Sequence, residues 1–142
     1  MSTSVAIVVC LVFVAIAIWH FVVATQIPSA VSVAVPSVDG RPLFVPSRSA
    51  TVAVGVVLCL FAGLVAATAG IVPVGLPAVA LSWLSYALAL GLLARAIGEF
   101  RYVGFFKRVR GSKFARLDTY VYSPLCMLLA LGVALVALRN GR

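Results

Sequence analysis

Residues 5–24 read VAIVVCLVFVAIAIWHFVVA, a stretch of 20 residues without a formal charge. A helix of this length is about 30 Å long, which matches the hydrocarbon thickness of a bilayer. The stretch ends in Trp19, His20 and Phe21, side chains suited to a membrane interface. It therefore predicts a first transmembrane helix. A cleaved signal peptide is the alternative, although no Lys or Arg precedes the apolar run and the run is long for a signal sequence.

The composition extends this conclusion to the rest of the chain. Of the 142 residues, 64% are hydrophobic and 10% are charged, whereas about a quarter of a typical soluble domain is charged. A soluble domain of this size could not bury so much apolar surface. The composition thus excludes a free soluble enzyme, a disordered chain and a nucleic-acid-binding module, and it predicts a single membrane domain over residues 1–142.

Three further apolar segments have the length of membrane spans. We expect helices over residues 51–71, 77–97 and 120–138. The last helix would be short if it began at Ser123-Pro124, so we expect it to begin earlier, near Asp118 or Thr119. The predicted fold class is all-α: a polytopic membrane bundle of four transmembrane helices, with a basic amphipathic interfacial segment between the third and the fourth.

The loop over residues 25–50 has features of a small β-hairpin. Val alternates with small or polar residues over 30–35, and Asp39-Gly40 is a dipeptide typical of two-residue hairpin turns. Residues 43–45 would form the return strand. An irregular interfacial loop is the alternative, because prolines on either side restrict this strand to edge pairing.

The loop over residues 98–119 carries most of the positive charge of a chain that has 11 Lys and Arg and only 3 Asp and Glu. On a helical wheel the aromatic and aliphatic residues of 101–110 gather on one side, with Arg101, Lys107 and Arg108 on the other. Arg110 interrupts the apolar edge. The pattern predicts an amphipathic helix in the membrane interface, with its basic side toward lipid phosphates or solvent.

The distribution of charge also predicts an orientation. With four spans, the loops over residues 25–50 and 98–119 lie on one side of the membrane and both termini lie on the other. The two loops and their flanks carry nine basic residues, against Arg139 and Arg142 near the C-terminus. The positive-inside rule therefore places the loops in the cytoplasm and both termini outside a cell membrane.

This topology gathers the polar side chains near the cytoplasmic face. The candidate polar site comprises His20, Arg95, Glu99, Arg101, Lys107, Arg110 and Asp118. We expect Arg95 and Glu99 to pair one turn apart, and we expect Asp118 to cap the fourth helix or to pair with a basic neighbour: Arg116, Arg101 or Lys107. The alternative is purely structural, with ionisable groups at helix ends that pair and reach the interface.

Two functions fit these features. The first is a non-enzymatic protein that binds an anionic lipid or partner at its cytoplasmic face. The second is a small membrane enzyme or transporter that acts on a lipid-like or anionic substrate through Glu99, Asp118 and His20. Transport would suit a homo-oligomer, because four short helices leave little room for a solvated path. The sequence has no metal-ligand spacing and no short catalytic or cofactor motif, so no catalytic residue, metal, cofactor or nucleic-acid partner is assigned.

The region around the third loop resembles a known family. Residues 95–108 read RAIGEFRYVGFFKR, residues 114–119 read FARLDT and residues 122–126 read YSPLC. Together they resemble an uncharacterised family of small prokaryotic membrane proteins, domain of unknown function 3995. The resemblance implies four membrane spans over nearly the whole chain, and it implies no activity.

Overall fold

The computed structural model describes residues 2–26, 34–39 and 41–140. Its long helices are α1 (Ser2–Thr25), α3 (Arg48–Thr68), α4 (Ala78–Ile97) and a continuous helix over residues 113–140, which comprises α5 (Lys113–Leu117), η1 (Asp118–Tyr122) and α6 (Ser123–Asn140). All four are long and apolar enough to cross a membrane. The all-α class and the predicted number of spans are therefore confirmed.

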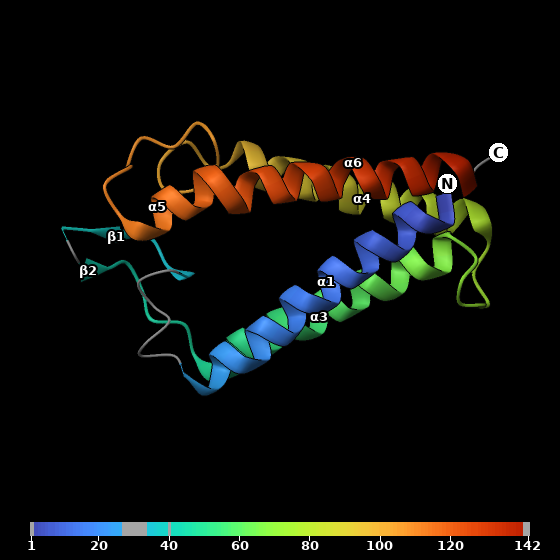
Figure 1. The fold of residues 1–142 in the computed structure, drawn as a ribbon, viewed down its shortest axis with the longest axis horizontal. Coiled ribbons are helices and arrows are strands. Elements are labelled where there is room, and N and C mark those ends of the chain that lie inside the picture. Colours follow the sequence, from blue (N-terminus) through green and yellow to red (C-terminus); the bar gives the residue numbers. More distant parts are fainter. Residues whose placement is uncertain (1, 27–33, 40, 141–142) are drawn as a thin grey trace.

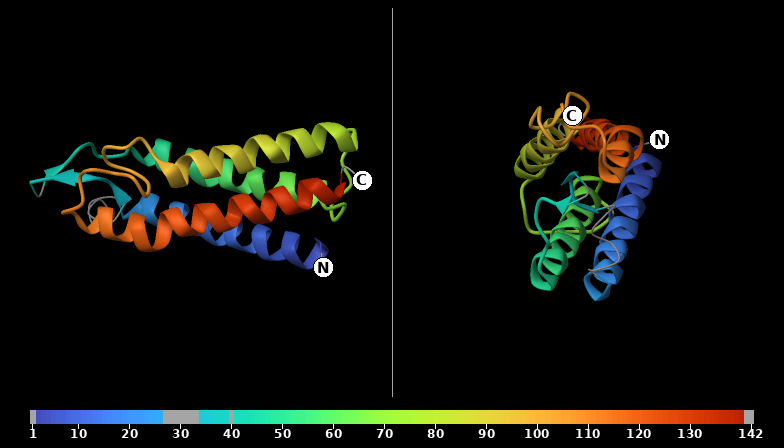
Figure 2. Two further views of the ribbon diagram at one scale, coloured as in Figure 1. Left: turned by 90° about the horizontal axis from the view of Figure 1, so that it is seen from above. Right: turned by 90° about the vertical axis from the view of Figure 1, so that its left-hand side faces the viewer.

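The helices form two pairs, α1 with α3 and α4 with α6 (Figure 1). The pairs converge near the two ends of the chain and diverge toward the opposite end. There the described parts of the first loop, residues 34–39 and 41–47, lie together with the loop over residues 98–112 (Figures 1 and 2). Buried apolar side chains from all four helices form one core: Ala6, Val9, Phe13, Ala62, Val65, Leu88, Ala89, Leu129, Val133 and Val136. The two loops thus share one end of the bundle, which is called the loop end below.

The boundaries of α3 differ from the predicted span because of a cap and a glycine. The helix begins at Arg48, since the Ser47 hydroxyl accepts a hydrogen bond from Ala50 N at 3.1 Å. It ends at Thr68, shortly before Gly70, whose φ of 70° is not helical. The span therefore lies a few residues earlier than residues 51–71.

The last helix is longer than predicted and contains a π-helical turn. It begins at Lys113, capped by Ser112, rather than near Asp118. Pro124 has no N–H, and its ring would clash with the carbonyl four residues earlier. The backbone widens just before it, and Ser123 N donates to Asp118 O five residues back. At 1.5 Å per residue this 28-residue helix is about 42 Å long, which exceeds the thickness of the hydrocarbon layer.

The loop after α1 contains a short hairpin of β1 (Ser37–Val38) and β2 (Arg41–Pro42). Asp39 occupies its turn with a φ of 49°, as the Asp-Gly dipeptide predicts. The strands are shorter than expected and lie closer to the turn, since residues 34–35 and 43–45 are not in strands. The remainder of the predicted first strand, residues 30–33, lies outside the described residues.

The predicted amphipathic helix over residues 101–110 is wrong, because this segment is a loop of bends and turns. Gly98 and Gly104 have φ values of 86° and 91°, which an α-helix of L-residues does not accommodate. Their backbones lie against each other, and Phe105 N donates to Ala96 O at 2.9 Å. The chain therefore folds back onto the end of α4.

Candidate functional site

The centre of the candidate site is Asp118, which is fully buried in the π-helical turn. Its Oδ1 accepts a hydrogen bond from Arg95 Nη2 at 2.8 Å. Its Oδ2 accepts from Lys107 Nζ at 3.0 Å and from Gly104 N at 2.6 Å. This carboxylate therefore joins α4, the loop over residues 98–112 and the last helix. We call Arg95, Lys107 and Asp118 the charge cluster; its two ion pairs are the only ones among the described residues.

Lys107 is buried as deeply as the acid, with 1% of its surface exposed. Its three ammonium protons have three acceptors: Asp118 Oδ2, Gly104 O at 2.9 Å and Thr119 Oγ1 at 2.6 Å. A buried ammonium without such partners would destabilise the fold by several kcal/mol. Lys107 is thus a fully bonded structural cation rather than a free ligand for a phosphate.

Gly104 is the loop residue that makes this arrangement fit. Its positive φ lets its N–H reach Asp118 while its carbonyl accepts from Lys107. A side chain at this position would collide with the carbonyl of Ile97, at the end of α4. A backbone N–H of the loop is therefore one of the three hydrogen-bond donors to the Asp118 carboxylate.

The structure brings together three of the seven predicted site residues. Lys107 is one of the partners expected for Asp118. Arg95 is not paired with Glu99 as predicted, because the packing of α4 against the last helix places it beside Asp118 instead. Glu99 is exposed, and its Oε1 accepts from Tyr102 N at 3.2 Å.

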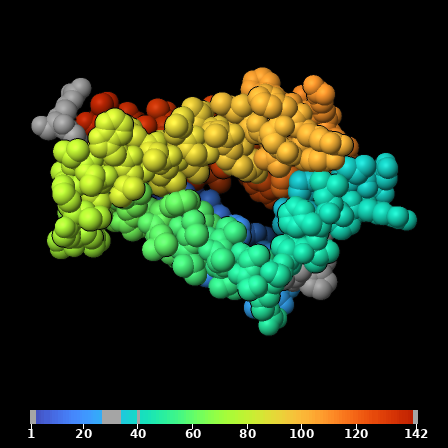
Figure 3. Space-filling view, turned by 180° about the vertical axis from the view of Figure 1, so that it is seen from behind, coloured from blue at the N-terminus to red at the C-terminus, as the bar shows by residue number. Residues whose placement is uncertain are grey.

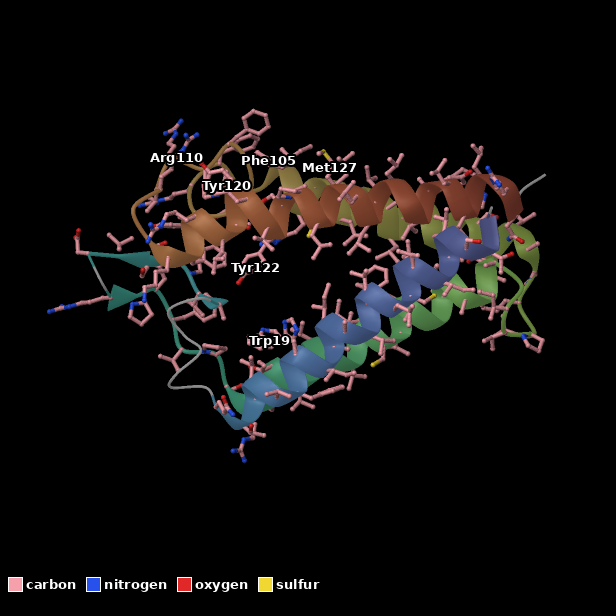
Figure 4. All side chains as sticks on the ribbon, in the orientation of Figure 1. Trp19, Phe105, Arg110, Tyr120, Tyr122 and Met127 are labelled. Carbon is pink, nitrogen blue, oxygen red and sulfur yellow. The ribbon has the colours of Figure 1, made fainter. Side chains whose placement is uncertain are left out.

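The other predicted site residues lie outside the charge cluster. The Nδ1 atom of half-buried His20 is 2.8 Å from Ile16 O, one turn earlier in α1. Arg101 is exposed, and its guanidinium lies 5.1 Å from the centre of the Tyr102 ring. Arg110 donates from Nε to Lys107 O at 3.2 Å and projects from the loop away from the helices (Figure 4).

Sequence reasoning did not find Gly104 and Thr119 as parts of the site. The sequence does contain one indication of the role of Gly104: it lies six residues after Gly98. Two glycines at this spacing can both adopt positive φ and face each other across a tight loop. Thr119 directly follows Asp118 but carries no distinguishing pattern. Its hydroxyl donates to Ala115 O at 3.1 Å and accepts from the buried lysine.

Outside the charge cluster, the loop end presents an exposed basic surface. It consists of Arg101, Arg108, Arg110, Lys113 and Arg116. Two exposed aromatic rings lie beside it, Phe100 and Phe106, with ring centroids 6.4 Å apart. Basic side chains next to exposed aromatic rings are typical of segments at the level of lipid headgroups.

Chemically, the two parts of the site differ. The oxygens of Asp118 already accept three hydrogen bonds, which leaves little capacity for a substrate or a transferred proton. The exposed basic surface, by contrast, has donors that no described carboxylate engages. The geometry therefore favours binding of an anion at the surface over acid–base chemistry at Asp118.

No curated protein and no solved structure is detectably similar to this chain. A family model described as a protein of unknown function (DUF3995) matches residues 6–133. The matched range contains the whole charge cluster and all five residues of the exposed basic surface. Because the match spans most of the chain, this four-helix membrane protein belongs to the DUF3995 family.

Proposed function

We propose that the protein is a non-enzymatic protein of the cell membrane that binds anionic lipid headgroups at its loop end. The observation that carries this proposal is the exposed basic surface, whose five cations form no ion pair with a described residue. Each basic residue near an anionic membrane surface contributes about 1 kcal/mol of attraction. Several of them together favour an anionic bilayer over a neutral one.

The lengths of the helices support a position of this surface at headgroup level. With α4 spanning about 30 Å, its last residue, Ile97, lies at the edge of the hydrocarbon layer. The loop follows directly and carries the exposed rings of Phe100 and Phe106. Aromatic rings anchored in the interface would hold the neighbouring arginines next to lipid phosphates.

Replacing Arg101, Arg108 and Arg110 together with glutamine should strongly weaken the preference for anionic lipid. Lys107 is left intact because it is buried. Three attractions of about 1 kcal/mol each are lost, which corresponds to roughly a hundredfold weaker preference. The measurement is partitioning of labelled phosphatidylglycerol to the protein in phosphatidylcholine nanodiscs. Arg139→Gln, at the other end of the bundle, is the control; an unchanged preference in the triple variant would contradict the proposal.

The proposed orientation has the loop end in the cytoplasm and both termini outside. It rests on the nine basic residues in the two loops and their flanks, against two near the C-terminus. A reporter enzyme that works only outside the cytoplasm should be active when it is fused after Arg142. The same reporter should be inactive when it is inserted at Gly111. A C-terminal fusion that reports a cytoplasmic location would show that the orientation is the reverse of the proposed one. The loop end would then not face the anionic lipids of the cytoplasmic leaflet.

A further inference from the structure

We propose that the lipid bound at the loop end carries two phosphodiesters, as cardiolipin does, with one phosphate in each of two adjacent pockets. This inference rests on the proposed function and deepens it, because it names the class of lipid. One pocket, of about 580 Å³, lies between the β-hairpin and the start of the last helix. The other, of about 510 Å³, lies on the loop over residues 98–112.

The two pockets are neighbours because Val109 lines both of them. The chain runs from Arg108, in the second pocket, to Lys113, in the first. A separation of five residues keeps their Cα atoms within about 18 Å even in a fully extended chain. The basic residues of the two pockets are therefore near enough along the chain to bind two phosphates of one lipid molecule. Figure 3 shows the hairpin and the loop side by side at this end.

The second pocket has the donors for one phosphate. Arg101 and Arg108 are both exposed and line it, and guanidinium groups bind phosphate oxygens through pairs of parallel hydrogen bonds. Contact with the Tyr102 ring restrains the Arg101 side chain. Phe100 forms part of the same wall and offers apolar contact to the glycerol and the first carbons of a lipid chain.

The first pocket has donors for the other phosphate. Lys113 is exposed, and Ser112 lies next to it in the lining. The Ser112 oxygen accepts from Ala115 N at 3.0 Å, so its own hydroxyl proton remains available for a phosphate oxygen. An ammonium and a hydroxyl together match one singly charged phosphodiester.

Each pocket also contains one carboxylate. Asp39 lines the first pocket and Glu99 the second, and neither forms an ion pair with a described residue. Two phosphates bound beside them are repelled, so neutralising either acid should strengthen binding. If the acids instead held the basic residues in place, neutralising them would weaken it.

A lipid fits this surface better than a soluble bisphosphate. The exposed rings of Phe100 and Phe106 lie beside the second pocket, at the end of a helix of membrane-spanning length. Acyl chains of a bound lipid would remain in the bilayer while its headgroup reaches both pockets. Linking two phosphates in one molecule makes the second contact intramolecular, and such linkage raises overall affinity well beyond that of a single contact.

The test is a lipid titration of the purified full-length protein in a nonionic detergent, followed by native mass spectrometry. Cardiolipin should bind at least about tenfold more tightly than phosphatidylglycerol. Lys113→Gln should remove most of this difference, because it weakens cardiolipin binding more than phosphatidylglycerol binding. Arg101→Gln with Arg108→Gln should weaken both lipids, whereas Asp39→Asn should tighten cardiolipin. Arg139→Gln, at the other end of the bundle and outside both pockets, is the matched control.

The outcomes separate this inference from the proposed function. A cardiolipin advantage of about twofold or less, with phosphatidylglycerol still preferred over phosphatidylcholine, overturns the two-phosphate site and leaves anionic-lipid binding intact. Loss of all preference among the three lipids overturns both. Inorganic pyrophosphate serves as the soluble probe: displacement of cardiolipin by an equal concentration of it would overturn the assignment to a lipid.

Discussion

Replacing Asp118 with asparagine should destabilise the protein by about 3–5 kcal/mol, because it leaves the buried Lys107 without its charge partner. The amide would also turn hydrogen-bond donors or a neutral oxygen toward three groups that all donate: Arg95 Nη2, Lys107 Nζ and Gly104 N. Thermal unfolding in detergent, followed by circular dichroism, measures the effect. The loop should loosen first, since the carboxylate joins it to both helices.

A second substitution makes this result specific. Lys107→Met in the Asp118→Asn background removes the uncompensated ammonium and should recover part of the lost stability, as a double-mutant cycle would detect. Glu99→Gln is the matched control, because this exposed acid has no ion pair among the described residues and should change stability by no more than about 0.5 kcal/mol. An Asp118→Asn protein as stable as the parent would refute the structural role given to the charge cluster.

Alanine at Gly98 or Gly104 should destabilise the loop end by more than about 3 kcal/mol. Gly98 has φ 86° and ψ −177°, a backbone region open essentially to glycine alone. Its added Cβ would collide with Val103 O, and a Cβ on Gly104 would lie 2.5 Å from Gly98 Cα. Backbone strain and overpacking each contribute about 1–3 kcal/mol, and neither contact can relax by a side-chain rotation.

Limited proteolysis at the loop, together with the unfolding temperature, reports this effect. Gly111→Ala is the control from the same loop, since nothing lies within 4 Å of its added Cβ and its backbone does not require glycine. We expect that variant to match the parent. Equal protease resistance of the Gly98 and Gly104 variants would show that the close backbone contact is not needed for the fold.

The membrane architecture could be predicted from sequence because it depends on long runs of one chemical character. Four apolar segments, separated by polar or turn-forming residues, leave few alternatives in a bilayer. The helix ends differ from the predicted ones where a single group decides them. Examples are the Ser47 cap before α3 and the hydrogen bond that Ser112 accepts from Ala115 N at the start of α5. Residues 101–110 misled the prediction because their helical spacing of basic and aromatic residues is equally compatible with an irregular interfacial loop. The positive φ at Gly104 decided against the helix.

The candidate site was predictable only in part, for a related reason. Spacing along a helix suggested that Arg95 pairs with Glu99, whereas the contact actually made depends on how α4 packs against the last helix. Lys107 was one of three basic partners that the sequence offered for Asp118, beside a role as helix cap, and the sequence could not rank them. The hydrogen bond from Gly104 N to Asp118 depends on the backbone conformation of the loop, which the pattern of side chains does not reveal.

The division into helix pairs has a consequence for how the protein is made. All three members of the charge cluster, Arg95, Lys107 and Asp118, belong to the second pair and its connecting loop, so none of them waits for a partner in the first. The ribosome completes α1 and α3 before α4 emerges, and each pair can enter the bilayer as an antiparallel helical hairpin with its own contacts already formed. The pairs then dock near the chain ends, where Thr68 and Ser85 share a hydrogen bond of 2.8 Å. In this order of assembly, the contacts between the two pairs are the last to form.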